Sequence, residues 1–410
     1  MFQWTEEQEM VRQALRQFVE KEIKPHLDEL EHGDLPPYDI LRKLYRTFGM
    51  DELARAGFEQ RLAGPGDRSE DGDRSEDGEA RGGGGRGVGL MLIPIIELCR
   101  YCPGMVTAMG VSVGLTAAAI MSRGTEPQKR RWALDLLTLD KIGAWAITEP
   151  NSGSDAFGSM RSTARRDGDE YVLNGSKTFI TNGPYADTIV FICKLDDGSA
   201  PADRKVLTFV LDRGMPGLEQ SKPLRKMGLH SSPTGELFLS DVRCGRDRLL
   251  GETEDTPARS GAKETFSMER TGVAAMALGI VEQCLELSVQ YARDRVQFGR
   301  PIGEFQLIQL KLAKMEVARM NIQNLVFRQI EMAAAGHPMS LAEASAGKLY
   351  AAQACMEVAL EAVQLFGGNG YMAEFHVEQL CRDAKVLQIY AGTDEIQVSQ
   401  IARSLLGGQS

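Results

Sequence analysis

The chain has no surplus of positive charge. Its 410 residues contain 47 Lys and Arg against 57 Asp and Glu, which gives a formal net charge of −10. A negative balance of this size argues against nucleic acid or an anionic membrane as the main partner. Any bound anion would therefore need arginines that are placed locally.

Cysteine and histidine are also scarce, with seven cysteines and five histidines in the whole chain. An odd number of cysteines in mostly apolar or helical surroundings fits reduced thiols better than a disulfide framework. Cys99 and Cys102 have the spacing of a redox or zinc pair, but no second pair accompanies them. We therefore interpret the cysteines as packing residues and predict no metal site.

The start of the chain shows neither a secretory nor a transit signal, and we find no apolar run of 18 residues. Thr5 and Gln8 instead form a capping box that predicts a helix from the first residues. We expect a cytoplasmic protein without membrane insertion.

Apolar residues at helical spacing predict helices up to about residue 140, with one interruption at 63–89. This segment holds a direct repeat, 67–72 and 73–78, followed by four glycines at 82–85. No Lys-Ser or Lys-Thr follows these glycines, so a phosphate loop is a poor fit. A stretch with almost no apolar residues cannot bury a core, and we predict a flexible insertion.

From about 141 to 260 the pattern changes to short β-rich runs at 188–192, 206–211 and 237–239. Runs of this length, separated by Gly, Asp and Pro, predict a small barrel or sandwich. Asn174-Gly175 lies between two further runs, 171–173 and 176–180. Because Asn-Gly is a preferred two-residue turn, we predict a hairpin centred there.

From about 261 onward the chain predicts long helices that form a four-helix bundle. Two apolar stripes at helical spacing are interpreted as core faces, and Gly367-Gly368 as the end of a helix. The stripes consist of Val273, Met276, Ile280, Cys284 and Leu287, and of Leu310, Ala313, Val317 and Met320. The predicted fold class is thus mainly α with a central β-domain.

A polar stretch at 144–183 is the best candidate for a ligand site. Residues 149–155, Glu-Pro-Asn-Ser-Gly-Ser-Asp, combine turn formers with small hydroxyls and bare backbone N–H groups. Such groups can bind an extended polar ligand, although a plain surface loop has the same composition. A second Thr-Asn-Gly loop at 181–183 makes a shared ligand surface the more plausible interpretation.

This stretch resembles the flavin-binding signature of the acyl-CoA dehydrogenase family. The matching runs are 146–149, 152–155 with Gly158, and 179–182, where Phe179 replaces the usual Trp. Residues 364–371 resemble a second signature, although Gln379 stands where a basic residue is usual. The resemblance implies an all-α N-terminal domain (1–140), a β-domain (141–260) and a C-terminal four-helix bundle (261–410).

The resemblance also implies FAD as the cofactor, bound at residues that match the family residue by residue. Thr148 corresponds to the hydroxyl on the flavin pyrimidine edge, Ser154 to that on the pyrophosphate, and Thr181 to the partner of flavin N5. Phe179 would pack on the ring. Thr393 and Glu395 would lie near the adenosine end.

A further group would reach the cofactor of an adjacent subunit, which implies a homo-oligomer and, by resemblance, a tetramer. In this group a guanidinium can bind a pyrophosphate through two hydrogen bonds and a phenyl ring offers an apolar face. An arginine taken alone is more commonly a surface salt-bridge partner. The group comprises Arg295, Gln297, Phe298, Gln364 and Gly368.

The family removes an α-proton from an acyl-CoA with a carboxylate, often a Glu at the position that Ala391 occupies here. Ala391 cannot accept a proton, although its backbone N–H can still polarise a carbonyl. Glu269, followed by Arg270, resembles the relocated base of isovaleryl-CoA and long-chain acyl-CoA dehydrogenases. We place Glu269 in the first turn of a helix, where the dipole would lower its pKa, so burial must raise it. Arg270 would shape the electrostatics of the site.

The resemblance therefore implies an FAD-dependent acyl-CoA dehydrogenase that passes electrons to an electron-transfer flavoprotein. A glutaryl-CoA role is disfavoured, because 103–108 offers no Arg for a distal carboxylate. Two alternatives stay open. One is a flavin oxidase or monooxygenase on the same fold. The other is a catalytically silent acyl-CoA-binding scaffold, which is suggested by Ala391 at the position of the usual base. Acyl chain length and branching are not fixed by these residues.

Overall fold

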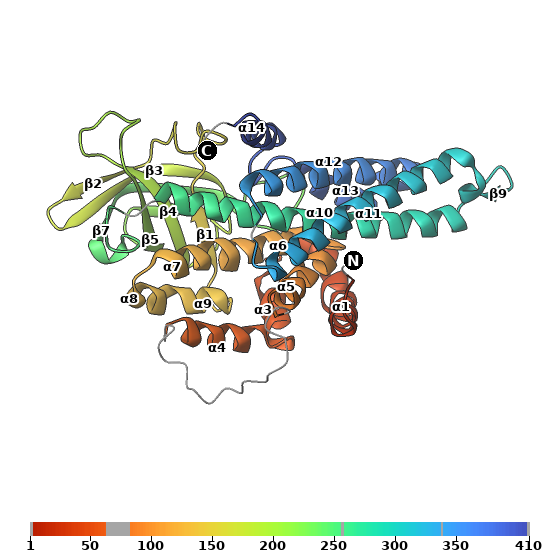
Figure 1. The fold of residues 1–410 in the computed structure, drawn as a ribbon, viewed down its shortest axis with the longest axis horizontal. Helices are drawn as coiled ribbons and strands as arrows, with labels where there is room; N and C mark the ends of the chain where they lie inside the picture. Colours follow the sequence, from red (N-terminus) through yellow and green to blue (C-terminus); the bar gives the residue numbers. More distant parts are fainter. Residues whose placement is uncertain (1–2, 63–82, 256–257, 338, 408–410) are drawn as a thin grey trace.

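A computed structural model describes the backbone of residues 3–62, 83–255, 258–337 and 339–407, and their side chains except at 83–86 and 258–268. Figure 1 shows N-terminal helices below a twisted sheet, with long C-terminal helices crossing the molecule and projecting beyond it as an arm. The predicted fold class, mainly α with a central β-domain, is confirmed. The domain boundaries at 140 and 260 stay a prediction.

The N-terminal region is helical, and the capping box of Thr5 and Gln8 is confirmed at its first helix. The helices Tyr38–Thr47 and Met50–Leu62 are separate, because Gly49 adopts a left-handed φ of 62° between them. The elements are α1 (Glu6–Phe18), η1 (Val19–Ile23), η2 (Lys24–His26), α2 (Leu27–His32), α3 (Tyr38–Thr47), α4 (Met50–Leu62), α5 (Gly83–Cys99), α6 (Pro103–Gly110), η4 (Val111–Ala117), α7 (Ala118–Arg123), α8 (Glu126–Gln128), η5 (Lys129–Ala133) and α9 (Leu134–Leu137).

The predicted insertion at 63–89 is partly wrong. Residues 83–89 form the first turns of α5 rather than a loop. The apolar run that begins at Val88 continues into this helix, so helix formation reaches back over the glycines. The direct repeat at 67–78 lies outside the described residues.

The middle region forms a seven-stranded sheet with the order β1-β4-β2-β3-β7-β6, and β5 pairs with β4. β4 runs parallel to β1 and β2, and the other neighbours are antiparallel. The strands are β1 (Gly143–Ala146), β2 (Thr163–Asp167), β3 (Glu170–Thr181), β4 (Thr188–Leu195), β5 (Val206–Asp212), β6 (Leu218–Gln220) and β7 (Thr234–Gly245), followed by η6 (Arg246–Arg248).

The hairpin predicted at Asn174-Gly175 is wrong. β3 runs through both residues, and the register with β7 shifts between Leu173 and Gly175, as at a β-bulge. A Cβ on Gly175 would lie 2.2 Å from Ser162 Oγ, so close packing explains this glycine. The turn lies earlier, between β2 and β3, where Gly168 adopts a φ of 62°.

The C-terminal region consists of long helices, and Gly367 ends one of them with a φ of 62°, as predicted. Figure 1 shows α11 and α12 side by side along the arm, with the small ribbon containing β9 at its tip. The elements are α10 (Ala258–Asp294), β8 (Val296–Gln297), β9 (Arg300–Pro301), η7 (Ile302–Glu304), α11 (Gln306–Ala334), α12 (Leu341–Phe366), η8 (Gly367–Tyr371), α13 (Val377–Val386) and α14 (Asp394–Leu405).

The two apolar stripes of these helices differ in their burial. On α10 the stripe from Val273 to Cys284 is buried, as predicted. On α11 the stripe is exposed, since Leu310, Val317 and Met320 are 51%, 58% and 50% exposed. The prediction of a core face there is wrong, because helical periodicity marks an apolar face without saying what covers it.

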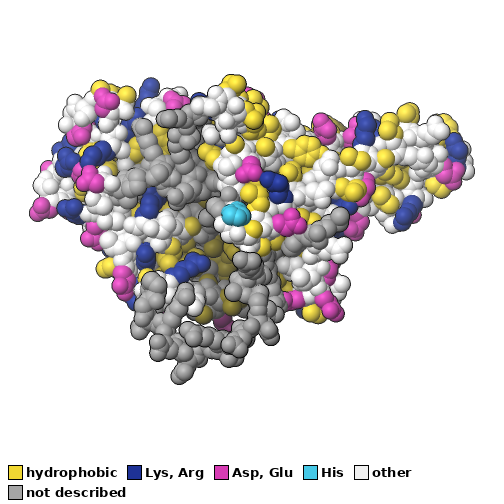
Figure 2. Space-filling view, in the orientation of Figure 1, with side chains coloured by type: hydrophobic (Ala, Val, Ile, Leu, Met, Phe, Trp, Pro, Cys, Tyr) yellow, Lys and Arg dark blue, Asp and Glu magenta, His cyan; other side chains and the backbone are white. Residues whose placement is uncertain are grey.

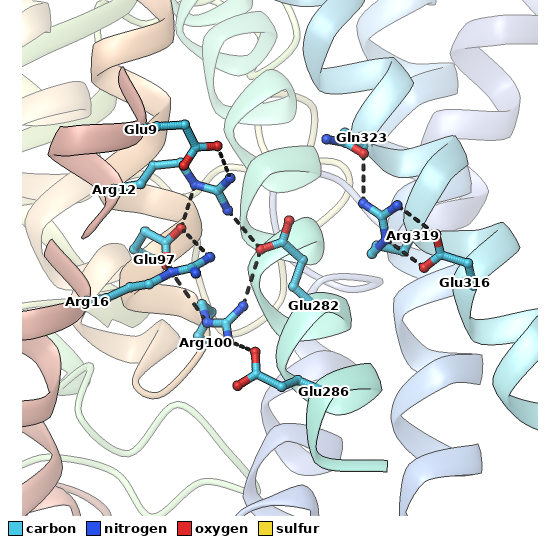
Figure 3. Close-up of polar contacts among 10 residues, drawn as sticks. All are labelled: Glu9, Arg12, Arg16, Glu97, Arg100, Glu282, Glu286, Glu316, Arg319 and Gln323. Carbon is cyan, nitrogen blue, oxygen red and sulfur yellow. Dashed lines mark hydrogen bonds and ion pairs between the residues drawn. The ribbon is translucent and has the colours of Figure 1, made fainter. Parts of the chain in front are cut away.

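The N-terminal helices are bound to α10 by a network of buried charges (Figure 3). Glu97 of α5 is fully buried and accepts hydrogen bonds from Arg12 Nε and Arg16 Nε of α1, each at 2.8 Å. Arg12 and Arg100 also donate to Glu282 of α10, at 3.2 and 3.3 Å. Each buried charge thus has a partner of opposite sign, and the network fixes α10 against the N-terminal region.

Two helical stretches, Pro103–Arg123 and Glu269–Asp294, are apolar and long enough to cross a membrane by length and composition alone. In each, 67% of the apolar window is buried inside the protein, which is typical of core helices. Six of the seven cysteines are buried, Cys99 and Cys102 among them, which agrees with a packing role. The absence of membrane insertion stays a prediction.

Candidate active site

A cavity of about 770 Å³ lies where the three regions meet. Its walls come from α6 and η4, from β1 and the polar loop that follows it, from the end of β3, and from α10, α13 and residues 390–393. Of the residues expected to bind the cofactor or act in catalysis, it brings together Thr148, Ser154, Phe179, Thr181, Glu269, Arg270, Ala391 and Thr393.

The polar loop is held in place by a buried ion pair. Lys177 Nζ, on β3, lies 2.9 Å from Glu149 Oε1 and 3.0 Å from the carbonyl oxygen of Ile147. The backbone N–H groups of Arg161 and Ser162 also donate to Glu149, at 2.7 and 3.0 Å. Burial alone would raise the pKa of Glu149, but Lys177 and these donors lower it by more. The net pKa is therefore below its usual value, and this carboxylate stays ionised.

Phe179 presents an aromatic ring to the cavity. The residue has a left-handed φ of 56°, and 69% of its surface is exposed. Exposing a ring in a strained backbone conformation is unfavourable unless the ring contacts a partner. The hydroxyl residues Thr148, Ser154 and Thr181 line the same cavity.

Glu269 lines the cavity, and its carboxylate has no hydrogen-bond partner among the described residues. Burial raises its pKa to about 7, against the opposing charges of Arg270 and Lys348. The prediction that it lies in a first helical turn is wrong, because α10 begins at Ala258. The helix dipole therefore has little influence on Glu269, and its environment is set by burial.

The other carboxylates that line the cavity differ from Glu269. Asp155 is exposed and accepts from Gly158 N at 3.2 Å and Ser159 Oγ at 2.6 Å. Glu149 is fully hydrogen-bonded, as described above. Among the carboxylates of this cavity, Glu269 thus combines a raised pKa with acceptor atoms that no described residue occupies, which is what a general base needs.

Arg270 holds the segment that carries Ala391. Its Nε lies 3.4 Å from the carbonyl oxygen of Ala391, and its Nη1 lies 3.2 Å from Ser345 Oγ on α12. Ala391 itself has a left-handed φ of 55°. The arginine therefore fixes a strained turn next to Glu269 and is not placed to accept a proton.

A second cavity, of about 900 Å³, lies at the tip of the arm. Arg295, Gln297, Phe298 and Gly368 line it, and Phe298 is 93% exposed with a φ of 54°. No lining residue is shared with the first cavity. Gln364 and Glu395 are exposed and line neither cavity.

The comparisons with known proteins agree with this arrangement. Three acyl-CoA dehydrogenase domain models match the chain: the N-terminal domain at 5–67 and 78–140, the middle domain at 144–242 and the C-terminal domain at 260–406. The chain belongs to the acyl-CoA dehydrogenase family.

Similar proteins match over nearly their whole length. An acyl-CoA dehydrogenase of Bacillus subtilis is 37% identical over 98% of this chain and 99% of its own. The structure of butyryl-CoA dehydrogenase from Megasphaera elsdenii has a TM-score of 0.82 at 34% identity and covers 99% of this chain and 100% of its own. A structure from work on the electron transferring flavoprotein of Acidaminococcus fermentans has a TM-score of 0.82 at 33% identity, with 99% of both chains covered.

Membership of the acyl-CoA dehydrogenase family makes this protein a flavin-dependent oxidoreductase that acts on CH–CH groups, with FAD as its cofactor and an acyl-CoA as its substrate. The first cavity fits FAD chemically, because it offers several hydroxyl residues, Thr148, Ser154 and Thr181 among them, and an uncovered aromatic ring. Among the described residues, no group of three or more His, Cys, Asp or Glu side chains could hold a metal ion.

Sequence reasoning missed several residues of this acyl-CoA dehydrogenase site. Lys348 and Gln397 are fully buried and donate to the carbonyl oxygens of residues 391–392. The sequence signal for Lys348 is weak, because its neighbour Ser345 is a second polar residue on the buried face of α12. Gln379 replaces the basic residue that is usual in the family. Its Nε2 donates to Asp383 Oδ2 at 3.2 Å, so a neutral amide rather than a cation is hydrogen-bonded to this carboxylate.

Proposed function

We propose that this enzyme converts an acyl-CoA thioester to the trans-2-enoyl-CoA, with Glu269 as the base that removes the α-proton. The observation that carries the proposal is the state of Glu269 in the cavity. Its carboxylate is free of hydrogen-bond partners among the described residues, and its pKa is raised to about 7. A base with a pKa near neutrality is ionised at working pH and still strong enough to take a proton.

The reaction needs no co-reactant other than the cofactor. Bound FAD supplies the acceptor for the hydride that leaves the β-carbon. The α-proton passes to Glu269, and the two electrons of the broken α C–H bond form the new double bond. We further propose that the backbone N–H of Ala391, which lines the same cavity as Glu269, polarises the thioester carbonyl.

The residues that would hold FAD divide between the two cavities. Thr148, Ser154 and Thr181 offer hydroxyls and Phe179 a ring in the first cavity, with Thr393 on its wall. Glu395, expected near the adenosine, follows Thr393 by two residues but lies outside the cavity lining. This set would bind the flavin and pyrophosphate ends of one cofactor.

Residues of the second cavity would complete the FAD site of a neighbouring subunit. Arg295 supplies a guanidinium for the pyrophosphate, and Phe298 an almost fully exposed ring. Gln297 and Gly368 line the same cavity, and Gln364, which is exposed on α12, belongs to the same proposal. A site divided in this way requires a homo-oligomer, and we propose a tetramer.

The exposed apolar face of α11 supports this assembly. Hydrophobic side chains gather on the arm in Figure 2, and Leu310, Val317 and Met320 of α11 are each about half exposed or more. Apolar faces of this kind mark surfaces that contact another protein. This apolar face lies on the same arm as the second cavity. We therefore propose that a second copy of the chain covers it.

Electron acceptor and substrate are inferred from the relatives. The similarity to a structure from work on an electron transferring flavoprotein supports such a protein as the acceptor. The butyryl-CoA dehydrogenase relative makes butyryl-CoA a suitable first substrate to test, with isovaleryl-CoA as the branched alternative. A cytoplasmic location also remains part of the proposal.

Anaerobic titration of the FAD-loaded enzyme with butyryl-CoA, isovaleryl-CoA and glutaryl-CoA tests the function. We expect at least one thioester to bleach the flavin of the wild type, and Glu269→Gln to slow bleaching by about 10²- to 10⁴-fold. Glu357→Gln, an exposed acid of α12, is the control. Unchanged bleaching in Glu269→Gln would eliminate this base, and no bleaching by any thioester in the wild type would favour the silent scaffold.

A second measurement distinguishes the oxidase alternative. After reduction by substrate, the enzyme is exposed to air and the recovery of flavin absorbance is followed. A dehydrogenase should reoxidise slowly unless an electron-transfer flavoprotein is added. Rapid recovery in air alone would identify an oxidase on the same fold.

A further inference from the structure

Lys348 is a fully buried lysine that contacts the backbone turn of the active site. It lies on α12, and its side chain has no solvent exposure. Its Nζ donates to the carbonyl oxygen of Gly392 at 2.9 Å and lies 3.4 Å from Asp394 Oδ1 at the start of α14. Burying an ammonium group is unfavourable unless it is paired and hydrogen-bonded, so this placement calls for an explanation.

The segment that Lys348 contacts is the strained turn of the active site. Ala391 and Gly392 both have left-handed φ angles, 55° and 88°. The carbonyl oxygen of Ala391 accepts from Arg270 Nε and from Gln397 Nε2, and that of Gly392 accepts from Gln397 Nε2 and Lys348 Nζ. Both carbonyls of the turn are thus held by buried donors. A left-handed alanine persists only where its surroundings determine its conformation in this way.

The same face of α12 also holds the helix that carries the base. Ser345 lies three residues before Lys348, so the two side chains are neighbours on the helix. Ser345 Oγ accepts from Arg270 Nη1 at 3.2 Å, and Arg270 directly follows Glu269. One turn of α12 therefore contacts both halves of the site: α10 through Ser345, and the 391–392 turn through Lys348.

We propose that Lys348 is a positioning residue for the dehydrogenation, which holds the Ala391–Gly392 turn in register with Glu269 and places a fixed positive charge near that carboxylate. This inference rests on the proposed function of Glu269. The positive charge of Lys348 acts on Glu269. Burial raises the pKa of Glu269, and the charges of Arg270 and Lys348 both oppose this rise. Burial lowers the pKa of Lys348 itself, while Asp394 raises it.

Other charged groups face the same region. Lys385 of α13 also lines the cavity, but it is exposed and donates to Gln388 rather than to the turn. The charged and titratable groups around Glu269 and Lys348 are Arg270 of α10, Tyr390, Asp394 of α14, Arg382 and Lys385 of α13, Lys226 of the β-domain, and Glu149 and Asp155 of the polar loop.

The test uses FAD-loaded Lys348→Met, which keeps the side chain's length and removes its charge and its donors. Single-turnover reduction by butyryl-CoA is followed as a function of pH. We expect the maximum rate to fall about 10- to 100-fold, because the turn loses its register. We also expect the apparent pKa of the reduction to rise by about 1 unit, because a positive charge near the base is lost. Lys21→Met, which removes the charge of an exposed lysine of η1 outside both cavities, should leave both quantities near those of the wild type.

A second variant keeps the test informative if Lys348→Met folds poorly. Asp394→Asn removes the partner carboxylate of Lys348 with little change in shape, and Asp394 is partly exposed. Loss of this negative charge should move the apparent pKa of reduction downward, opposite to the shift in Lys348→Met. A purely structural role for Lys348 would not produce shifts of opposite sign.

The outcomes separate this inference from the proposed function. Loss of bleaching in Glu269→Gln, together with a normal rate and pH profile in Lys348→Met, would overturn the positioning role alone. Shifts of the pH profile in the same direction in Lys348→Met and Asp394→Asn would also overturn the positioning role. Normal bleaching in Glu269→Gln would overturn both proposals.

Discussion

Lys177 Nζ lies 2.9 Å from Glu149 Oε1, and the two side chains are only 0% and 5% exposed. This buried pair joins β3 to the polar loop that carries Thr148 and Ser154. Removing one partner of a buried ion pair leaves the other charge without compensation, which costs about 3–5 kcal/mol. The pair is therefore a structural requirement of the flavin side of the cavity.

Lys177→Met should accordingly lower the free energy of unfolding by about 3–5 kcal/mol and weaken FAD retention. Urea unfolding of the FAD-loaded protein measures the first effect, and release of flavin during gel filtration the second. The double variant Lys177→Met/Glu149→Gln should recover part of the lost stability, because no buried charge is left alone. Equal stability of the single variant and the wild type would contradict the ion-pair argument.

Stability should depend on pH through Glu269. Its pKa is raised from 4.5 to about 7 in the folded protein, so the folded state binds more protons than the unfolded state between these values. The contribution of this group is fully present below pH 4.5 and is lost as the pH rises through about 7. Glu269→Gln stays neutral and should become more stable than the wild type above pH 7, by at most about 3 kcal/mol.

This prediction is checked by urea unfolding of both proteins at pH 5 and pH 8. The difference between them should be small at pH 5 and largest at pH 8. Glu357→Gln, at an exposed position on α12, should show no such dependence. A constant difference across the range would mean that burial of Glu269 does not set its ionisation.

Phe179 should contribute to FAD affinity through its ring. Phe179→Ala is expected to weaken FAD binding by about 1 kcal/mol, or roughly fivefold, since stacking of aromatic groups contributes about 0.5–1.5 kcal/mol. Phe179→Trp should bind at least as tightly as the wild type. Isothermal titration of the apoprotein with FAD measures both, and Phe238→Ala, a 42% exposed phenylalanine on β7 outside the cavity, serves as control.

The exposed stripe of α11 should control assembly. Val317→Lys places a charge in the middle of this apolar face and should shift the protein to a smaller species in analytical ultracentrifugation. Met91→Lys, at a 73% exposed position on α5, should leave the mass unchanged. An unaltered mass of Val317→Lys at micromolar concentration would show that another surface joins the subunits.

The sequence predicted the fold class and many residues that line the first cavity, because the helices, the strands and the flavin signature are patterns that are local in the chain. Periodicity located the helices and strands, and the flavin signature placed Thr148, Ser154, Phe179 and Thr181 in one cavity. The role of Glu269 as the base stays a prediction, which rests on the family resemblance and on Ala391, and the two residues line the same cavity.

Two of the errors are misplaced helix starts, at 83 and at 258, and the others depended on contacts distant in sequence. Asn174-Gly175 has the composition of a turn, but the approach of Ser162 requires a glycine there inside a strand. The two-residue turn is Gly168-Asp169, between the paired residues Asp167 and Glu170, and Gly at the first turn position is itself a hairpin signal. The stripe on α11 has the periodicity of a core face, and periodicity does not tell a core from a contact with another chain. Lys348 was missed because nothing in its neighbourhood reveals the backbone carbonyl that it meets.

The separation of the two cavities has a consequence for how the enzyme behaves on dilution. Figure 1 shows the arm's tip at the end of the molecule opposite the sheet, and the cavity there shares no residue with the one that contains Glu269. A monomer would then supply only one of the two parts of the proposed FAD site. FAD binding and subunit association are then linked equilibria. Dilution should therefore promote dissociation of FAD, and added FAD should promote association of the subunits.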